Sequence, residues 1–276
     1  MRHDSFAAAG ILISGLWVGT AAIAASATPD AATETAHNGC YQVGPQTPRD
    51  IDNPTGTNPV LFPIAPDYKQ LNLCNIHFHA NAEHRAKAFA IRAPSEPGIG
   101  GYQCSLGENL TASELQPVKK PVCEGIKSGD TIEVHWVHTS CNVAPGPTLG
   151  ACLSKNCANP TLRVETQVFT LVNDPAATNF ADLDYAGARI NGYHQAKSIP
   201  QNTGQPVEFL GSTTGPSYNN QNTCSPYQVT WSVRPSCAKL DINSLHAWCE
   251  NNVFDEDHAH KSRLLVEDPA LLSEIN

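Results

Sequence analysis

The sequence predicts a single domain built mainly from β-strands, with only short helices. Stretches of four to eleven residues alternate in polarity, as Val164, Thr166 and Val168 do with Glu165 and Gln167, and alternation with a period of two is typical of strands. Segments rich in Pro, Gly, Asn and Ser separate these stretches, and such segments form turns and loops. The predicted class is therefore mainly β with long loops.

Four strands and two short helices are expected from this pattern. The strands are predicted at residues 71–80, 131–138, 162–172 and 227–233. The helical segments are 111–115, where Thr111 and Glu114 have the spacing of a capping box, and 242–248. Residues 142–159 and 204–224 are expected to be loops. No internal repeat is evident.

The N-terminus has the features of a signal peptide. Arg2 and His3 precede an apolar run of small residues at 6–25, and a small-x-small cleavage site follows at 25–27. A retained membrane anchor is the alternative, since the run is almost long enough to span a bilayer. We predict a signal peptide at 1–27, an extended arm at 28–70 and a catalytic domain at 71–276. The mature chain of about 250 residues suffices for one β-rich domain and is expected to be soluble.

The cysteine count points to an oxidising compartment. All ten cysteines follow the predicted signal peptide, and an even count in an exported chain favours disulfides. No C-x-x-C motif occurs, which weighs against a cysteine-rich zinc site. The pairing does not follow from the sequence, but three local pairs are possible: Cys152 with Cys157, Cys104 with Cys123, and Cys237 with Cys249. A secreted or periplasmic location is expected.

The overall charge excludes several partners. The net charge of −9 disfavours nucleic acids and anionic membranes, which an acidic surface repels. The chain also lacks a glycine-rich phosphate loop, a G-x-S-x-G motif and a basic patch with interleaved aromatic residues. These absences exclude several classes of enzyme.

A histidine pair on one predicted strand is the strongest functional signal. His77 and His79 lie two residues apart, so their side chains leave the strand on the same face about 6 to 7 Å apart. On another strand, Glu133 and His135 share a face, and pairing of the two strands would bring His135 beside the first two. Three imidazoles on a rigid sheet leave a tetrahedral Zn²⁺ one open position, as in catalytic zinc sites. Cobalt and cadmium also fit three imidazoles.

Nearby polar residues suit the support of such ligands. A ligating imidazole commonly donates its second N–H to a carboxylate or carbonyl group, so Asn75 and Glu133 are the expected partners of His77 and His135. His138 should lie on the opposite face of its strand and serve packing. The acidic segment 255–260 is more simply a solvated surface than a metal site.

Four motifs resemble the carbonic anhydrases. The run C-N-I-H-F-H-A-N-A-E-H at 74–84, followed by E-V-H-W-V-H at 133–138, is similar to the delta class and overlaps with the alpha-class H-F-H and E-L-H-L-V-H. G-S-T-T-G-P at 211–216 with V-T-W at 229–231 resembles alpha-class G-S-L-T-T-P-P…V-T-W, and Q-T-P-R-D-I at 46–51 resembles Q-S-P-V-D-I. These motifs occur in the order of the family.

The resemblance implies a fold and an activity. The fold would be a central twisted, mostly antiparallel sheet of the alpha-carbonic-anhydrase type, with a disulfide between Cys40 and Cys224. The activity would be the reversible hydration of CO₂ to bicarbonate by a zinc-bound hydroxide, with the zinc on His77, His79 and His135. Thr214 would orient the hydroxide.

The resemblance also assigns two further residues. Glu83 would accept the hydroxyl hydrogen of Thr214, and His84 would be a buried structural histidine.

The chain departs from the alpha pattern in two places. Glu83 follows His79 by only four residues, which is the compact spacing of the delta class. The region that carries the alpha-class proton-shuttling histidine is shortened and holds no histidine, so His194, His258 and His260 are candidates without positional support. Two other functions stay open: a non-enzymatic secreted zinc-binding protein that uses the same histidines, and a disulfide-braced recognition domain.

Overall fold

The fold was analysed in a computed structural model that describes residues 40, 42–94, 100–214 and 223–276. The predicted signal peptide at 1–27 lies outside the described residues. Within 42–67 the chain forms no helix or strand, and an isolated bridge joins Asp50 to Arg85. Among the described residues, no helix is both long and apolar enough to cross a membrane.

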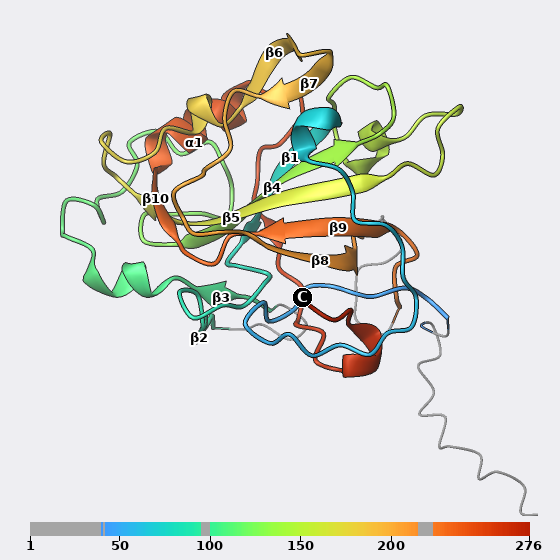
Figure 1. Cartoon of the computed structure of the whole chain (residues 1–276). Coiled ribbons are helices and arrows are strands. Elements are labelled where there is room, and N and C mark those ends of the chain that lie inside the picture. Colours follow the sequence, from blue (N-terminus) through green and yellow to red (C-terminus); the bar gives the residue numbers. More distant parts are fainter. Residues whose placement is uncertain (1–39, 41, 95–99, 215–222) are drawn as a thin grey trace, which may run out of the picture. The chain divides into compact units, whose positions relative to one another are not determined.

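A mixed β-sheet forms the centre of the domain (Figure 1). Its strand order is β11-β1-β4-β5-β9-β8, and β10 pairs with β5. The strands are β1 (Asn72–Ala80), β4 (Thr131–Thr139), β5 (Leu162–Val172), β8 (Val207–Ser212), β9 (Gln228–Val233), β10 (Ala238–Asp241) and β11 (His260–Lys261). The pairs β1/β4, β4/β5 and β8/β9 are antiparallel, whereas β1/β11, β5/β9 and β5/β10 are parallel.

The sheet confirms the predicted mainly β class and its four strands, but it contains more strands than expected. Residues 204–224 were predicted to be a loop, yet β8 lies within them because Phe209 and Leu210 pair with Trp231 and Thr230. The short strands β10 and β11 were also missed. Strands of two to four residues are too short to show a period, and β8 does not alternate because the apolar Phe209 and Leu210 are adjacent and Gly211 follows them.

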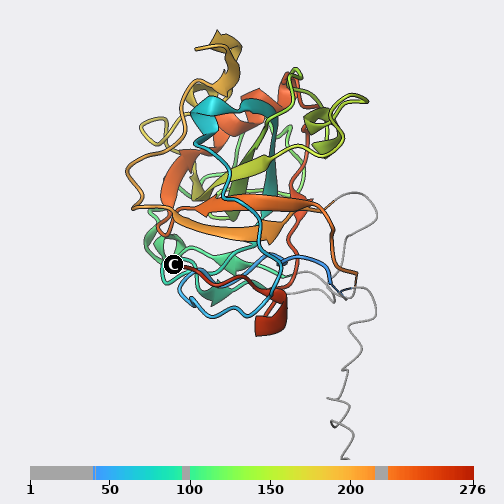
Figure 2. The same cartoon turned by 45° about the vertical axis from the view of Figure 1, so that its right-hand side comes forward.

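Small elements surround the sheet. β2 (Ile91–Arg92) pairs with β3 (Tyr102–Gln103), and β6 (Tyr185–Ile190) pairs with β7 (Tyr193–Ala196) in a hairpin at the top of the view in Figure 2. The 3₁₀ helices are η1 (Tyr68–Gln70), η2 (Ser105–Asn109), η3 (Leu149–Cys152), η4 (Phe180–Asp182) and η5 (Pro269–Leu271).

The one α-helix of the described residues is α1 (Ile242–Glu250), which confirms the segment predicted at 242–248. It begins at Asp241, whose side chain accepts a hydrogen bond from the backbone N–H of Asn243. The helix predicted at 111–115 was wrong. Thr111 and Glu114 do form the hydrogen bonds of a capping box, but the chain makes only a turn there.

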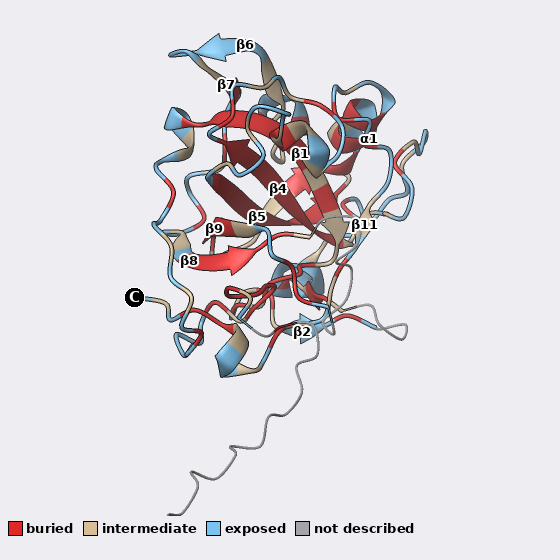
Figure 3. Cartoon of the chain, turned by 90° about the vertical axis from the view of Figure 1, so that its right-hand side faces the viewer, coloured by how far each residue is buried: buried red, intermediate tan, exposed pale blue. Residues whose placement is uncertain are grey.

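Each face of the sheet packs against its own apolar cluster. On one face, Ile76, Phe78, Val134 and Trp136 pack with α1 through Trp248. The other face contributes a second set of buried residues: Val137, Val164, Val168, Phe209 and Trp231. Burial on both faces makes the central strands almost wholly buried (Figure 3). Polar side chains that point inward from these strands are therefore held rigidly and away from bulk water.

Five disulfides brace the domain, and none of the ten cysteines is free. They join Cys40 to Cys224, Cys74 to Cys152, Cys104 to Cys237, Cys123 to Cys249, and Cys141 to Cys157. The first pair is the one that the resemblance implied. The three local pairs proposed from the sequence were wrong, because the fold brings together cysteines that are far apart in the chain. Such a set of disulfides indicates an extracellular or periplasmic compartment.

Candidate metal centre

Three histidines converge where the neighbouring strands β1 and β4 pair. His77 and His79 leave β1 on the same face, and His135 of β4 is the direct cross-strand partner of His77. The ring centroids lie 5.2 Å apart for His77 and His79, 5.0 Å for His77 and His135, and 4.9 Å for His79 and His135. One nitrogen of each ring lies within 4.8 Å of the other two. The group has the donor number and spacing of a three-histidine metal site.

Hydrogen bonds orient two of these rings. His77 Nδ1 lies 2.7 Å from Asn75 Oδ1, so Asn75 engages this nitrogen and not His77 Nε2. His135 Nε2 lies 2.7 Å from Glu133 Oε1, and its Nδ1 lies 3.2 Å from His77 Nε2. Because a carboxylate or amide oxygen accepts the N–H on the outer side of each ring, a lone pair on the inner side is available to a metal.

The third ring is held from the edge of the sheet. β11 runs parallel to β1, with His260 beside His79 and Lys261 beside Ala80. His79 Nδ1 lies 3.3 Å from the carbonyl oxygen of Lys261 and 3.4 Å from Glu83 Oε1. Its Nε2 is therefore the nitrogen that remains for a metal.

Burial keeps the imidazoles of His77 and His79 neutral. The pKa of His77 is well below its ordinary value of 6.5, and that of His79 falls to about 4. Burial is the largest cause in both, and the neighbouring imidazoles lower both values further, while Glu83 acts in the opposite direction on His79. Metals bind neutral imidazole, so His77 and His79 can bind a metal at pH 7 without first losing a proton.

Glu133 supports two histidines at once. Its carboxylate accepts a hydrogen bond from the backbone N–H of His84 at 3.0 Å and lies 2.8 Å from His84 Nδ1, in addition to His135. Although burial alone would raise the pKa of Glu133, electrostatic interactions and hydrogen bonds with His84 and His135 hold it well below its ordinary value. Glu133, His84 and His135 also lie close enough to hold a metal. However, the carboxylate is already occupied as an acceptor, so the three-histidine group fits a metal better.

The carboxylate of Glu83 has other partners than those expected. It is fully buried and accepts hydrogen bonds from the backbone N–H of Arg263 at 3.0 Å and from its Nε and Nη2 at 3.3 and 3.4 Å. Burial is the largest influence on its pKa and would raise it, but Arg263 and the neighbouring imidazoles outweigh burial and lower the value to about 2. Among the described residues, no hydrogen bond joins Glu83 to Thr214.

Thr214 lies just beyond the end of β8 and is half-buried. The end of β8 approaches the histidines through Trp231, whose indole N–H donates to the Ser212 carbonyl at 3.0 Å and whose ring centroid lies 5.0 Å from that of His135. The neighbouring Thr213 is fixed by its backbone N–H, which donates to the Tyr227 carbonyl at 2.8 Å. The segment 215–222 that follows Thr214 lies outside the described residues.

Comparison with known families places the chain. The model of the family described as "Delta carbonic anhydrase" matches residues 68–244, more than half of the chain. The chain belongs to the delta carbonic anhydrase family. The matched range includes the three histidines, Glu83, Glu133 and Thr214. No curated protein matches the chain.

Several solved structures are similar to the chain at low sequence identity, among them carbonic anhydrases and dioscorin complexed with ascorbate. A hyperthermostable carbonic anhydrase from an active hydrothermal vent chimney shares 15% identity over 84% of this chain and 86% of its own, with a TM-score of 0.33. The alpha-carbonic anhydrase of Thermovibrio ammonificans, solved with sulfanilamide, shares 16% identity over 81% of this chain and 84% of its own, with a TM-score of 0.28. The alpha-carbonic anhydrase of Photobacterium profundum shares 15% identity over 84% of this chain and 91% of its own, with a TM-score of 0.28. The family assignment rests on the family match alone.

The remaining histidines of this family member take different places. His84 and His138 are fully buried, and His138 lies on the opposite face from His135, where its ring centroid is 5.4 Å from that of Tyr68. His194 is bound to the hydroxyl of Tyr185 at 2.7 Å. Neither His138 nor His194 joins the histidine group.

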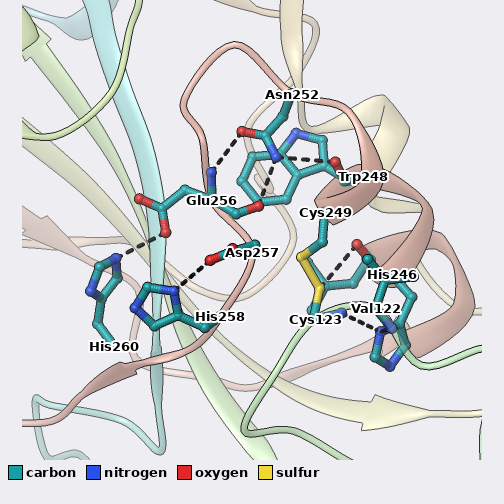
Figure 4. Close-up of a disulfide and its surroundings, with 11 residues drawn as sticks. Val122, Cys123, His246, Trp248, Cys249, Asn252, Glu256, Asp257, His258 and His260 are labelled. Atoms are coloured by element: carbon teal, nitrogen blue, oxygen red, sulfur yellow. Dashed lines mark hydrogen bonds and ion pairs between the residues drawn. A yellow bond between two sulfur atoms is a disulfide. The ribbon is translucent and has the colours of Figure 1, made fainter.

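His260 is the residue that sequence reasoning could not place. Its ring centroid lies 5.6 Å from that of His77 and 5.7 Å from that of His79. Figure 4 shows it beside His258, with Glu256 and Asp257 turned toward the two rings. The hydrogen bond from His260 Nε2 to Glu256, at 2.9 Å, raises the pKa of His260 above its ordinary value. No local motif links this segment to β1, since the two are about 180 residues apart in the chain and are brought together by the β1/β11 pair.

Proposed function

We propose that this protein is a zinc-dependent carbonic anhydrase that catalyses the reversible hydration of CO₂ to bicarbonate and a proton. The family and the fold support CO₂ hydration in general. The observation that carries the specific proposal is the convergence of His77, His79 and His135, three imidazoles each with one nitrogen within 4.8 Å of the other two. Such a donor set is typical of catalytic zinc sites that keep one position open for water.

The residues present fit zinc. Imidazole nitrogens are preferred zinc ligands, and each ring here has an acceptor for its second N–H: Asn75, Glu133, and the Lys261 carbonyl with Glu83. In carbonic anhydrases as a class, bound zinc supplies a water whose pKa is about 7, so that a hydroxide is available at neutral pH.

The protein's own groups would prepare the reaction. The three imidazoles would hold the metal, and Asn75 and Glu133 would fix the tautomers of His77 and His135. Thr214 is the proposed orienting residue, because its hydroxyl can accept a hydrogen from the nucleophile and so turn its lone pair toward CO₂. The support for Thr214 is its position after β8, the strand whose end Trp231 links to His135.

The proposed setting is the periplasm or the outside of the cell, with a cleaved signal peptide at 1–27. The five disulfides support an oxidising compartment. The substrate would be CO₂ or bicarbonate, and we propose neither a nucleic acid nor a membrane partner for the mature chain.

Metal removal and return test the proposal. Purified mature protein would be stripped with a chelator, reloaded with zinc and assayed by stopped-flow CO₂ hydration, with zinc content measured in parallel. We expect one zinc per chain, loss of turnover on stripping and recovery on reloading. A folded, zinc-replete protein that does not hydrate CO₂ would instead be a non-enzymatic zinc-binding protein that uses the same histidines.

A pair of variants tests the role of Thr214. Thr214→Ala should lower kcat about 100-fold, the scale of a misplaced reactant, with unchanged zinc affinity. Thr214→Ser keeps the hydroxyl and should retain most of the activity, while Thr213→Ala is the matched neighbour. If kcat fell further in Thr213→Ala than in Thr214→Ala, Thr213 would be the residue that orients the nucleophile.

A further inference from the structure

We propose that Glu83 and Arg263 form a positioning pair for His79, so that the C-terminal segment 260–263 is an integral part of the metal site. The inference rests on the proposed metal site and concerns how one ligand is oriented. The resemblance assigned Glu83 to the hydroxyl of Thr214, whereas the geometry assigns it to His79 and to Arg263.

The chain path after β1 brings Glu83 back toward His79. Asn81 adopts a left-handed conformation with a φ of 65°, which asparagine tolerates better than most residues. The chain therefore turns sharply at the end of the strand, and the side chain of Glu83, four residues after His79, lies 3.4 Å from His79 Nδ1. A strand that continued straight would carry this carboxylate away from the ring.

Glu83 needs a positive partner because it is completely buried. A buried carboxylate is costly unless it is paired and hydrogen-bonded. Arg263 supplies all three hydrogen bonds that Glu83 accepts in the described part of the chain, one from its backbone and two from its side chain. The Arg263 side chain is 16% exposed, so this pair is largely shielded from solvent.

His79 Nδ1 then faces two oxygens. It donates a hydrogen bond to the Lys261 carbonyl at 3.3 Å, and the negatively charged Glu83 Oε1 lies 3.4 Å away, where it attracts the N–H of the neutral ring. The arrangement corresponds to that of His135, whose outer nitrogen faces Glu133. Both oxygens depend on the C-terminal segment, since Lys261 belongs to it and Arg263 holds Glu83.

The C-terminal segment has few other ties to β1. The β1/β11 ladder contains two residue pairs, and the Ser262 hydroxyl donates to the Ala80 carbonyl. The backbone N–H of Gly100 also donates to the Ser262 carbonyl at 3.0 Å. These contacts are mainly between backbone atoms, so the Glu83–Arg263 pair is the link that depends on side-chain charge. The segment lies beyond residue 244, where the family match ends.

Zinc affinity and the spectrum of bound cobalt test the inference. Arg263→Met and Glu83→Gln should each raise the zinc Kd about tenfold, measured by competition with a chelator, because loss of an outer ligand partner typically has this effect. Cobalt(II) absorption should change in both variants, since it reports ligand geometry. Arg263→Lys keeps the charge and should retain most of the affinity.

A double variant and a control complete the design. If the two residues act as one unit, Glu83→Gln with Arg263→Met should cost no more affinity than either change alone. Arg189→Met, which alters an exposed arginine of β6, should leave the Kd and the cobalt spectrum unchanged.

The inference would be overturned if Arg263→Met bound zinc with the parental Kd and cobalt spectrum, even with a lowered Tm, because the pair would then be only structural. Glu83→Gln and Arg263→Lys keep the test open should Arg263→Met fail to fold. A parent that binds zinc but does not hydrate CO₂ would defeat the proposed function and leave the positioning role intact. A parent that binds no zinc would defeat both.

Discussion

His135 and His79 are supported by two different kinds of structure. His135 lies on a central strand, and its acceptor Glu133 is two residues away on the same strand at 2.7 Å. His79 lies near the end of β1, and the two oxygens beside its Nδ1, at 3.3 and 3.4 Å, depend on the segment 260–263. The first ligand is fixed by local sequence inside the sheet, whereas the second is fixed by a distant segment at its edge.

The difference indicates where the site is most rigid. A central strand is hydrogen-bonded on both sides and buried on both faces, so its side chains have little freedom. An edge strand with a two-residue ladder opens at a lower free energy. We therefore expect His135 and Glu133 on β4 to determine whether the metal binds. The segment 260–263, which supports His79, should adjust the affinity for the metal.

Among the residues that accept an N–H from a metal-binding histidine, Glu133 should have the largest influence on the zinc Kd when it is changed to Gln. The change removes the acceptor shared by His84 and His135, so we expect the zinc Kd to rise about 100-fold, the upper end of the usual range for such partners. Chelator competition measures it. If Glu133→Gln weakened zinc no more than Glu83→Gln, the proposed difference between the two sides would be wrong.

Zinc removal should affect the two sides unequally. Zinc at 100 times its Kd stabilises the folded protein by about 2.7 kcal/mol. Hydrogen exchange with and without zinc should show the larger gain in protection at residues 260–263, because that edge depends on the ordered His79 ring. Equal gains at β4 and β11 would contradict this view.

His138 provides the smallest test, because it shares β4 with His135 but lies on the other face. Its pKa falls from 6.5 to about 3, chiefly through burial, and Trp136, Arg163 and Asp67 modify the value. Between these pH values the unfolded chain binds a proton that the folded protein does not. Stability should therefore fall as the pH falls from 6.5 toward 3, by about 1.4 kcal/mol per pH unit from this residue.

Urea unfolding of the metal-free protein at pH 7.5 and pH 5.5 checks this contribution. His138→Phe should lose less stability than the parent over that interval, since the other buried histidines are common to both proteins. Identical losses would show that His138 is not held neutral by burial.

Much of the site could be predicted from local sequence, and the rest depends on long-range contacts. The strand period placed His77 and His79 on one face and separated His135 from His138, because side-chain direction on a strand follows position alone. The expected neighbours Asn75 and Glu133 lie two residues from their histidines and share the same face. The fold was likewise predictable where strands are long, as in β4 and β5.

The elements that sequence could not supply are short or distant. β11 is too brief to show a period and β8 does not alternate in polarity, so both strands depend on pairing with β1 and β9. Arg263 is about 180 residues from Glu83 and carries no motif. For this reason the partner of Glu83 was not foreseen, and the roles of Glu83 and Thr214 stay predictions.

Stopped-flow CO₂ hydration by the zinc-loaded protein and by His135→Ala tests the central claim most directly. His138→Gln serves as the matched change on the same strand and opposite face, and circular dichroism confirms that each variant is folded. We predict turnover and bound zinc in the parent and in His138→Gln, and neither in His135→Ala. A folded His135→Ala that hydrates CO₂ at the parental rate would contradict the three-histidine site.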